Sequence, residues 1–165
     1  MSKKYLIAYG TAAGSTAEVA EAVGEELRKG GVEVDVQAVE AVRDLSAYDG
    51  IVIGSAVRAF HLLPSTRKFI RKNKKALQAK PLAYFLVCMT MGEDTPENVQ
   101  KATKFAKPLL ALKEPVSLGL FGGCMDPEKL TGMFAKTMRS QPKEDKRDWE
   151  AIQAWSQGLA SKFPA

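Results

Sequence analysis

The sequence predicts an α/β fold in which helices cover both faces of a parallel β-sheet. Five short apolar runs alternate with segments of helical periodicity, which is the pattern of strands joined by crossover helices. Three of these runs are almost continuously apolar, as expected of parallel strands that are buried on both sides. The expected strands are Lys4–Tyr9, Glu33–Ala38, Gly50–Ser55, Leu82–Met89 and Val116–Gly122.

Helical patterns fill the gaps between these strands. An apolar face that includes Val19, Val23 and Leu27 marks a first helix, which we expect to end at Gly30 and Gly31. Asp148 is placed to cap the last helix. The other expected helices are Leu63–Leu77, which opens with a proline in its first turn, Pro96–Leu112 and Pro127–Arg139.

Residues 124–147 are more than a simple connection between the fifth strand and the last helix requires. They hold the expected Pro127–Arg139 helix and then a charged stretch, Ser140–Arg147. Two explanations are open: this insertion packs over the edge of the sheet, or it forms a flap or a surface for a partner. We expect residues 1–165 to form one domain with the insertion inside it.

Composition excludes several functional classes. No apolar run approaches the roughly 18 residues of a membrane span, so a cytoplasmic location is expected. Cys88, Cys124 and the lone His61 are too few for a disulfide scaffold or for a metal site built from histidine and cysteine. The Gly-x-Ser-x-Gly pattern of a serine nucleophile is absent, which argues against Ser-His-Asp chemistry.

The net charge of +5 is concentrated in one run of seven cations between Arg67 and Lys80, with no acidic residue among them. One interpretation is the solvated face of a helix. The other is a patch for an acidic partner, an anionic membrane surface or nucleic acid. Only Phe69 interrupts the run with an aromatic ring, which argues against base stacking and therefore against nucleic acid.

The first strand and the loop that follows it predict a phosphate site. A buried strand, a loop of small and hydroxyl residues and a helix start direct several backbone N–H groups to one spot. No lysine follows Gly14, and the three-glycine dinucleotide pattern is absent. A phosphate held by amides and by the hydroxyls of Thr11, Ser15 and Thr16 fits flavin mononucleotide (FMN) better than ATP or NAD. Helix capping by Ser15, with Glu18 completing a capping box, is the alternative.

Three loops are expected to meet where the parallel strands end. Ligands bind beyond the carboxyl ends of such strands, at the point where the strand order reverses. The loops after the first, third and fourth strands are Gly10–Thr16, Ser55–Leu63 and Met89–Glu93, and each is rich in small residues. Their agreement strengthens the prediction of one ligand site.

Several side chains near these loops have two interpretations. Phe60 and Met91 either line a flavin ring or belong to the core, and Arg58 is either a donor to the flavin or a surface arginine. His61 either touches a substrate or caps the following helix. Cys88 and Cys124 are interpreted as buried apolar fillers, because no basic residue adjoins either of them to lower its pKa.

The stretch Tyr9–Thr16 resembles the phosphate loop of flavodoxins, with alanines at two of the hydroxyl positions. Within that superfamily the chain more closely resembles the menaquinone-dependent protoporphyrinogen dehydrogenases and their flavodoxin-domain relatives. The residues that carry this likeness are Ile53–Arg58 with His61, Lys68-Phe69, Lys80-Pro81 and Arg147–Ile152.

The resemblance implies a flavodoxin-like fold with five parallel strands in the order 2-1-3-4-5, and FMN as the cofactor. It also implies the cofactor contacts, which are Thr11, Ala12, Ala13, Gly14, Ser15, Thr16, Ser55, Ala56, Val57, Arg58, Ala59, Phe60, Met89, Thr90, Met91 and Gly92. No catalytic side chain and no metal ligand are assigned.

The function that follows is an FMN oxidoreductase that moves electrons between its flavin and a quinone or organic substrate. Protoporphyrinogen oxidation is the specific case that the resemblance implies. A flavodoxin that carries electrons between redox protein partners, without a substrate of its own, is the main alternative. A module that uses the same loop to bind another phosphate ligand, or none, is the third.

Overall fold

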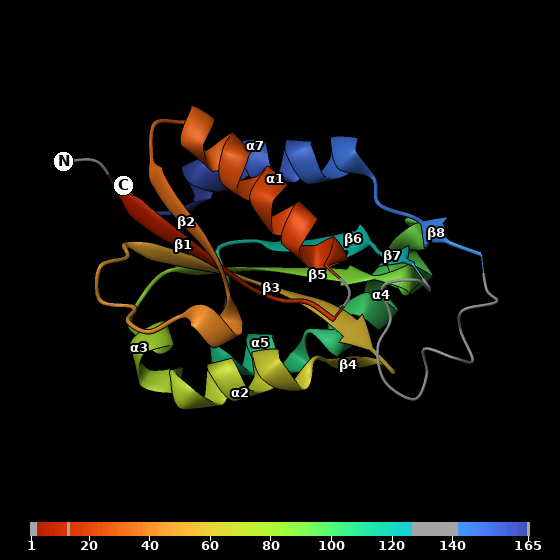
Figure 1. The fold of residues 1–165 in the computed structure, drawn as a ribbon, viewed down its shortest axis with the longest axis horizontal. Coiled ribbons are helices and arrows are strands. Elements are labelled where there is room, and N and C mark those ends of the chain that lie inside the picture. The colour runs from red at the N-terminus through yellow and green to blue at the C-terminus, as the bar shows by residue number, and fades with distance from the viewer. Residues whose placement is uncertain (1–2, 13, 127–141, 165) are drawn as a thin grey trace.

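In the computed structural model, which describes residues 3–12, 14–126 and 142–164, five parallel strands form a sheet with helices on both faces (Figure 1). The strands are β1 (Lys4–Gly10), β2 (Glu33–Ala38), β3 (Gly50–Arg58), β5 (Leu82–Cys88) and β6 (Leu118–Gly122). Their order is β2-β1-β3-β5-β6, which confirms the predicted 2-1-3-4-5 arrangement of the parallel strands.

Helices of the described residues cover both faces of the sheet, with α1 and α7 on one face and α2, α3 and α5 on the other (Figure 1). Apolar side chains of α1 (Ser15–Lys29) and α7 (Trp149–Lys162) pack with β1 in one cluster. On the opposite face, α2 (Pro64–Lys72), α3 (Lys74–Gln78) and α5 (Lys107–Leu112) contribute to the second cluster. The core therefore has two apolar layers, as the continuously apolar strands predicted.

The helix signals that the sequence carries are largely confirmed. Val19, Val23 and Leu27 are fully buried on one face of α1, and that helix ends before Gly30. The side chain of Asp148 accepts a 3.1 Å hydrogen bond from the backbone N–H of Ala151, so it caps α7 as expected.

Two expected helices are each broken in two. Asn73 interrupts Leu63–Leu77, where its backbone leaves the helical conformation, and its side-chain amide and its backbone N–H both donate to the Phe69 carbonyl, at 2.9 and 3.1 Å. Ala106 separates α4 (Pro96–Phe105) from α5, because Pro108 has no N–H to donate to a carbonyl four residues earlier. These breaks bring α5 alongside α2.

The remaining elements are short and lie near the ends of the strands. Two 3-10 turns, η1 (Val39–Ala41) and η2 (Met89–Gly92), follow β2 and β5, and β4 (His61–Leu62) runs antiparallel to β3. The ends of the 124–147 insertion pair with one another as β7 (Cys124–Met125) and β8 (Glu144–Asp145). The helix expected at Pro127–Arg139 lies outside the described residues.

Candidate cofactor site at the carboxyl edge of the sheet

The three loops predicted to meet do converge at the carboxyl ends of β1, β3 and β5. Gly10 at the end of β1 is paired with Ser55 in β3, and Ala56 is paired with Val87 in β5. A small cavity of about 80 Å³ is lined from all three directions, by Ala12 and Ser15, by residues 56–58 and by residues 87–89. The three loops therefore meet at the switch in strand order, where the sequence predicts a ligand site.

Beside this cavity, a larger cleft of about 660 Å³ opens to the surface. Its lining includes Phe60, Met89, Thr90 and Gly92 from the second and third predicted loops. Met89 lines both spaces, so they adjoin at the end of β5. A cleft of this volume lies within the range of about 300–1,000 Å³ that holds small ligands.

The loop between β1 and α1 has the geometry of an anion site. Gly14 caps α1 with φ +90°, a left-handed conformation in which a side chain would be strained, and its N–H donates to Thr11 Oγ1 at 2.9 Å. None of the described side chains caps the helix, and the first helical N–H groups have no intrahelical acceptor. The capping-box alternative is therefore wrong. Ala13 lies outside the described residues.

Thr16 gives an independent sign of a ligand at this loop. Its side chain is fully buried in the first turn of α1, yet its Oγ1 has no hydrogen-bond partner among the described residues. Leaving a buried hydroxyl without a partner costs about 1–3 kcal/mol. An anion at the start of α1 would accept hydrogen bonds from the Thr16 hydroxyl and from the first N–H groups of the helix, so the residues present fit a phosphate.

A buried hydroxyl pair supports the loop from below. Ser55 in β3 and Thr66 in α2 are both fully buried, and their side-chain oxygens lie 2.9 Å apart. Thr66 fills the space where Gly10 has no side chain, because a Cβ atom at Gly10 would lie 2.1 Å from Thr66 Oγ1. Ser55 is therefore buried beneath the loop and does not lie on the open surface of the candidate site.

The second predicted loop is a β-hairpin. β3 continues to Arg58, and Ala59 and Phe60 form a two-residue turn in which both have positive φ, 50° and 66°. Such a turn usually contains glycine or asparagine, and strained backbone of this kind gathers at functional sites. The Phe60 side chain is 72% exposed, with its ring centroid 5.8 Å from that of Phe105. Arg58 and His61 are exposed beside it.

The third loop forms the turn η2 beneath the cleft. Met91 is buried, whereas Met89 is exposed at the mouth of the cleft. Burial raises the pKa of the Cys88 thiol, although the backbone N–H groups of Met91 and Thr90 bond to it and oppose the shift. A thiol with a raised pKa stays protonated at neutral pH and is a poor nucleophile. This supports the interpretation of Cys88 as a buried filler.

Sequence reasoning missed Arg147, which reaches the start of α1 from the end of the insertion. Its side chain is only 8% exposed, contacts Glu18 at 2.5 Å and Asp145 at 2.8 Å, and donates to the Ser15 carbonyl at 3.5 Å. Hydrogen bonds from Arg147 lower the pKa of Asp145 to about 2. The neighbouring Lys146 donates its backbone N–H to the Gly123 carbonyl at 2.8 Å and lines the cleft.

We call residues 143–147 the return segment, because they bring the chain back across the edge of the site from β6 toward α1. Arg147 supplies a cation beside the phosphate loop, although the loop itself contains none. The sequence places this arginine 129 residues from its Glu18 partner, and no local pattern reveals such a contact. The feature of the sequence that pointed to Arg147 was its place in the stretch Arg147–Ile152, which carries the family resemblance.

Within the described residues, no group of three or more His, Cys, Asp or Glu side chains could hold a metal ion. No helix in this part of the chain is long and apolar enough to cross a membrane.

The chain matches a known protein family and is similar to a protein of known activity. The model of the family described as Flavodoxin domain matches residues 6–150. The protoporphyrinogen IX dehydrogenase [quinone] of Escherichia coli K12 is 31% identical over 107 residues, which cover 62% of this chain and 59% of that protein. The match therefore spans less than two thirds of that relative.

Solved structures give the same fold over nearly the whole chain. Oxidised flavodoxin 1 from Bacillus cereus has a TM-score of 0.64 at 18% identity, and the match covers 98% of this chain and all of that one. FMN-bound flavodoxin from Fusobacterium nucleatum has a TM-score of 0.60 at 11% identity, with 98% and 99% covered. At such identities the likeness establishes the fold.

Proposed function

Because the chain belongs to the flavodoxin domain family, we propose that it is an FMN-dependent oxidoreductase that exchanges electrons with a quinone or another organic substrate. A flavin-binding redox protein is what the family and its relatives support. FMN is the cofactor of the family's flavodoxins, as in the F. nucleatum protein. The single observation that carries the proposal is the buried hydroxyl of Thr16 at the start of α1, which has no hydrogen-bond partner in the part of the chain that the structure describes.

We assign the FMN phosphate to the loop at Thr11–Thr16. The free N–H groups at the start of α1 and the Thr16 hydroxyl would donate to it, while Gly14 lets the backbone turn without strain. Arg147 lies close enough to add a positive field, although Asp145 and Glu18 offset its charge. The loop binds, and the return segment holds it in place.

We assign the flavin ring to the space between the β3–β4 hairpin and η2. Residues 56–60 would lie along one side of it and residues 89–92 along another. When bound, FMN accepts and returns electrons in pairs or singly. The chain's part is to orient the ring, exclude water from one face and set the local charge.

The charges around this space favour a raised reduction potential. Arg58 and Lys146 line the two spaces, and Glu93 is the acidic residue among the described lining. Lys101 also lines the cleft, but Glu97 offsets its charge. A positive surround stabilises negative charge on a reduced cofactor more than an acidic surround does. That direction favours exchange with a quinone over donation to low-potential acceptors.

For the substrate we propose protoporphyrinogen IX, with a quinone as electron acceptor, after the name of the E. coli relative. We also propose that residues 1–165 form one domain in the cytoplasm, with 124–147 as an insertion. Lys68 and Lys72, on the exposed side of α2, would provide peripheral contact with an anionic membrane in which quinones dissolve.

The alternative is a carrier flavodoxin that passes electrons between redox proteins. The exposed Phe60 ring favours this candidate, because an apolar side chain at the mouth of the cleft suits a protein docking surface. Anaerobic turnover separates the two. The isolated FMN-loaded protein should oxidise protoporphyrinogen IX when a menaquinone analogue is supplied. Failure to turn over any quinone, together with rapid electron exchange with a reductase, would leave only the carrier.

A further inference from the structure

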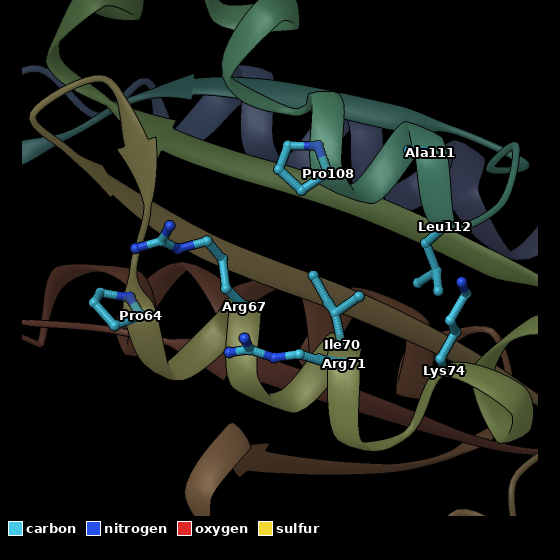
Figure 2. A pocket seen from close by; sticks show the side chains of 8 residues that line it. All are labelled: Pro64, Arg67, Ile70, Arg71, Lys74, Pro108, Ala111 and Leu112. Atoms are coloured by element: carbon cyan, nitrogen blue, oxygen red, sulfur yellow. The ribbon is translucent and has the colours of Figure 1, made fainter.

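A groove separates α2 from α5 on the face of the sheet opposite α1 and α7. Its volume is about 450 Å³. Figure 2 shows Ile70 from α2 and Leu112 from α5 pointing into the gap from its two sides, with Pro108 further along α5. The floor of the groove is therefore apolar.

Cations line the rim of this groove without acidic partners. Arg67, Arg71 and Lys74 follow one side, as Figure 2 shows. An adjoining hollow of about 410 Å³ shares Arg67 and Pro108 with the groove and adds Lys104 and Lys107. Neither lining contains an acidic residue, and none of the five cations forms an ion pair within the described residues.

Five cations line this groove and its adjoining hollow without an ion pair to any described residue, whereas several basic residues elsewhere on the protein are neutralised by an acidic neighbour. Arg28 pairs with Glu25, Lys29 with Glu26, and Lys101 on the neighbouring α4 with Glu97. Unpaired like charges around one depression repel each other and raise the free energy of the empty state. A ligand that carries negative charge relieves that repulsion.

We propose that the α2–α5 groove is a binding site for a small amphipathic dianion, a molecule with an apolar body and two carboxylate groups. Its volume is that of a small-molecule site, and its concave shape fits an inserted ligand better than a flat membrane surface does. The apolar body packs on Ile70, Pro108 and Leu112, while the carboxylates meet the cations of the rim.

The spacing of the cations explains why two anionic groups are needed. At a helical rise of 1.5 Å per residue, Arg67 and Arg71 lie about 6 Å apart along the axis of α2. Lys74 lies farther along the same rim, beyond the break at Asn73. One carboxylate cannot contact both ends of this stripe, whereas two carboxylates at the ends of a rigid body can. Each arginine also offers a fork that matches a carboxylate.

The test is calorimetric titration of the purified FMN-loaded protein with stilbene-4,4′-dicarboxylate, and with its dimethyl ester as the uncharged control. We expect saturable equimolar binding of the dicarboxylate and none of the ester. The double variant Arg67→Gln/Arg71→Gln should weaken binding at least tenfold. The matched variant Lys68→Gln/Lys72→Gln, with the same change in net charge on the same helix, should stay within twofold of the parent protein.

A third variant tests the floor without changing any charge. Ala111→Trp fills the groove and should also weaken binding at least tenfold, while the far-ultraviolet circular dichroism spectrum of every variant shows that the fold is intact. Equal losses in the two double variants would overturn the proposal, because diffuse electrostatics would then explain them. So would binding to phosphatidylglycerol vesicles without binding of the dicarboxylate. The titration reads binding alone, so failure of the proposed redox function leaves its result unaffected.

Discussion

Replacing Gly10 by alanine should destabilise the protein through one identified contact beneath the phosphate loop. The added Cβ atom would lie 2.1 Å from Thr66 Oγ1, well inside van der Waals contact, in a region where Thr66 and Ser55 are fully buried. Thr66 must move, which also separates its hydroxyl from that of Ser55, now at 2.9 Å. Overpacking costs about 1–3 kcal/mol and a buried hydrogen bond about 0.5–1.5 kcal/mol. We expect a loss of about 2–4 kcal/mol in the free energy of unfolding.

A double-mutant cycle tests whether Thr66 is the cause. In Thr66→Ala the clashing oxygen is gone, and the nearest atom of that residue to the new Cβ is its own Cβ, at 3.4 Å. The double variant Gly10→Ala/Thr66→Ala should therefore lose at least about 1 kcal/mol less than the sum of the single losses. Gly158→Ala in α7 is the matched control, since nothing lies within 4 Å of its added Cβ.

Urea unfolding followed by circular dichroism gives the free energies of unfolding of the four proteins in the cycle and of the control Gly158→Ala. Gly158→Ala should raise stability by about 0.5–1 kcal/mol, because alanine restricts the unfolded chain and favours helix. If Gly10→Ala falls within about 0.5 kcal/mol of the parent protein, or if the losses in the cycle simply add, the proposed packing beneath the loop is wrong.

Three further outcomes follow from the site. Thr16→Val should leave the FMN-free protein at least as stable as the parent protein. It should weaken FMN binding about tenfold by fluorescence titration, since a charge-assisted hydrogen bond is lost. A loss of stability that parallels the loss of FMN binding would contradict the role of its hydroxyl. Arg147→Gln should speed FMN release several-fold in stopped flow, because the return segment loses its contacts with Glu18 and Asp145; an unchanged rate would argue against that segment holding the loop. The folded-state pKa of Asp145, about 2, is lower than its usual 3.8. Its stabilising effect is therefore present above pH 4 and fades as the pH falls toward 2, and Asp145→Asn should remove that part of the acid dependence of the melting temperature.

Periodicity predicted the elements that are defined by burial. The continuously apolar strands and the face of α1 at Val19, Val23 and Leu27 follow from which residues must leave water, and that is a local property of the sequence. The strand order then followed from the family resemblance. The loop at Thr11–Thr16, to which we assign the phosphate, could be proposed from the sequence because its glycine and hydroxyl residues are close together in the chain.

The parts that could not be predicted depend on long-range contacts or unusual backbone. The β3–β4 hairpin turns at Ala59 and Phe60, which both have positive φ. Neither is glycine or asparagine, the residues that usually indicate such a turn in a sequence. Arg147 reaches Glu18 across nearly the whole chain, and its contact depends on how the insertion returns to the sheet. The cations between Arg67 and Lys80 are evident in the sequence, but their position around a groove with Lys104 and Lys107 nearby depends on the packing of α5 against α2.

The most direct measurement is a visible absorption spectrum of the freshly purified protein, followed by release and identification of the chromophore. We predict a yellow protein with the two bands of oxidised flavin and an equimolar amount of FMN. Thr16→Val, measured beside it, should hold less. A colourless protein that takes up no added FMN would contradict the assignment of the loop at Thr11–Thr16 to a flavin phosphate, and with it the proposed redox function.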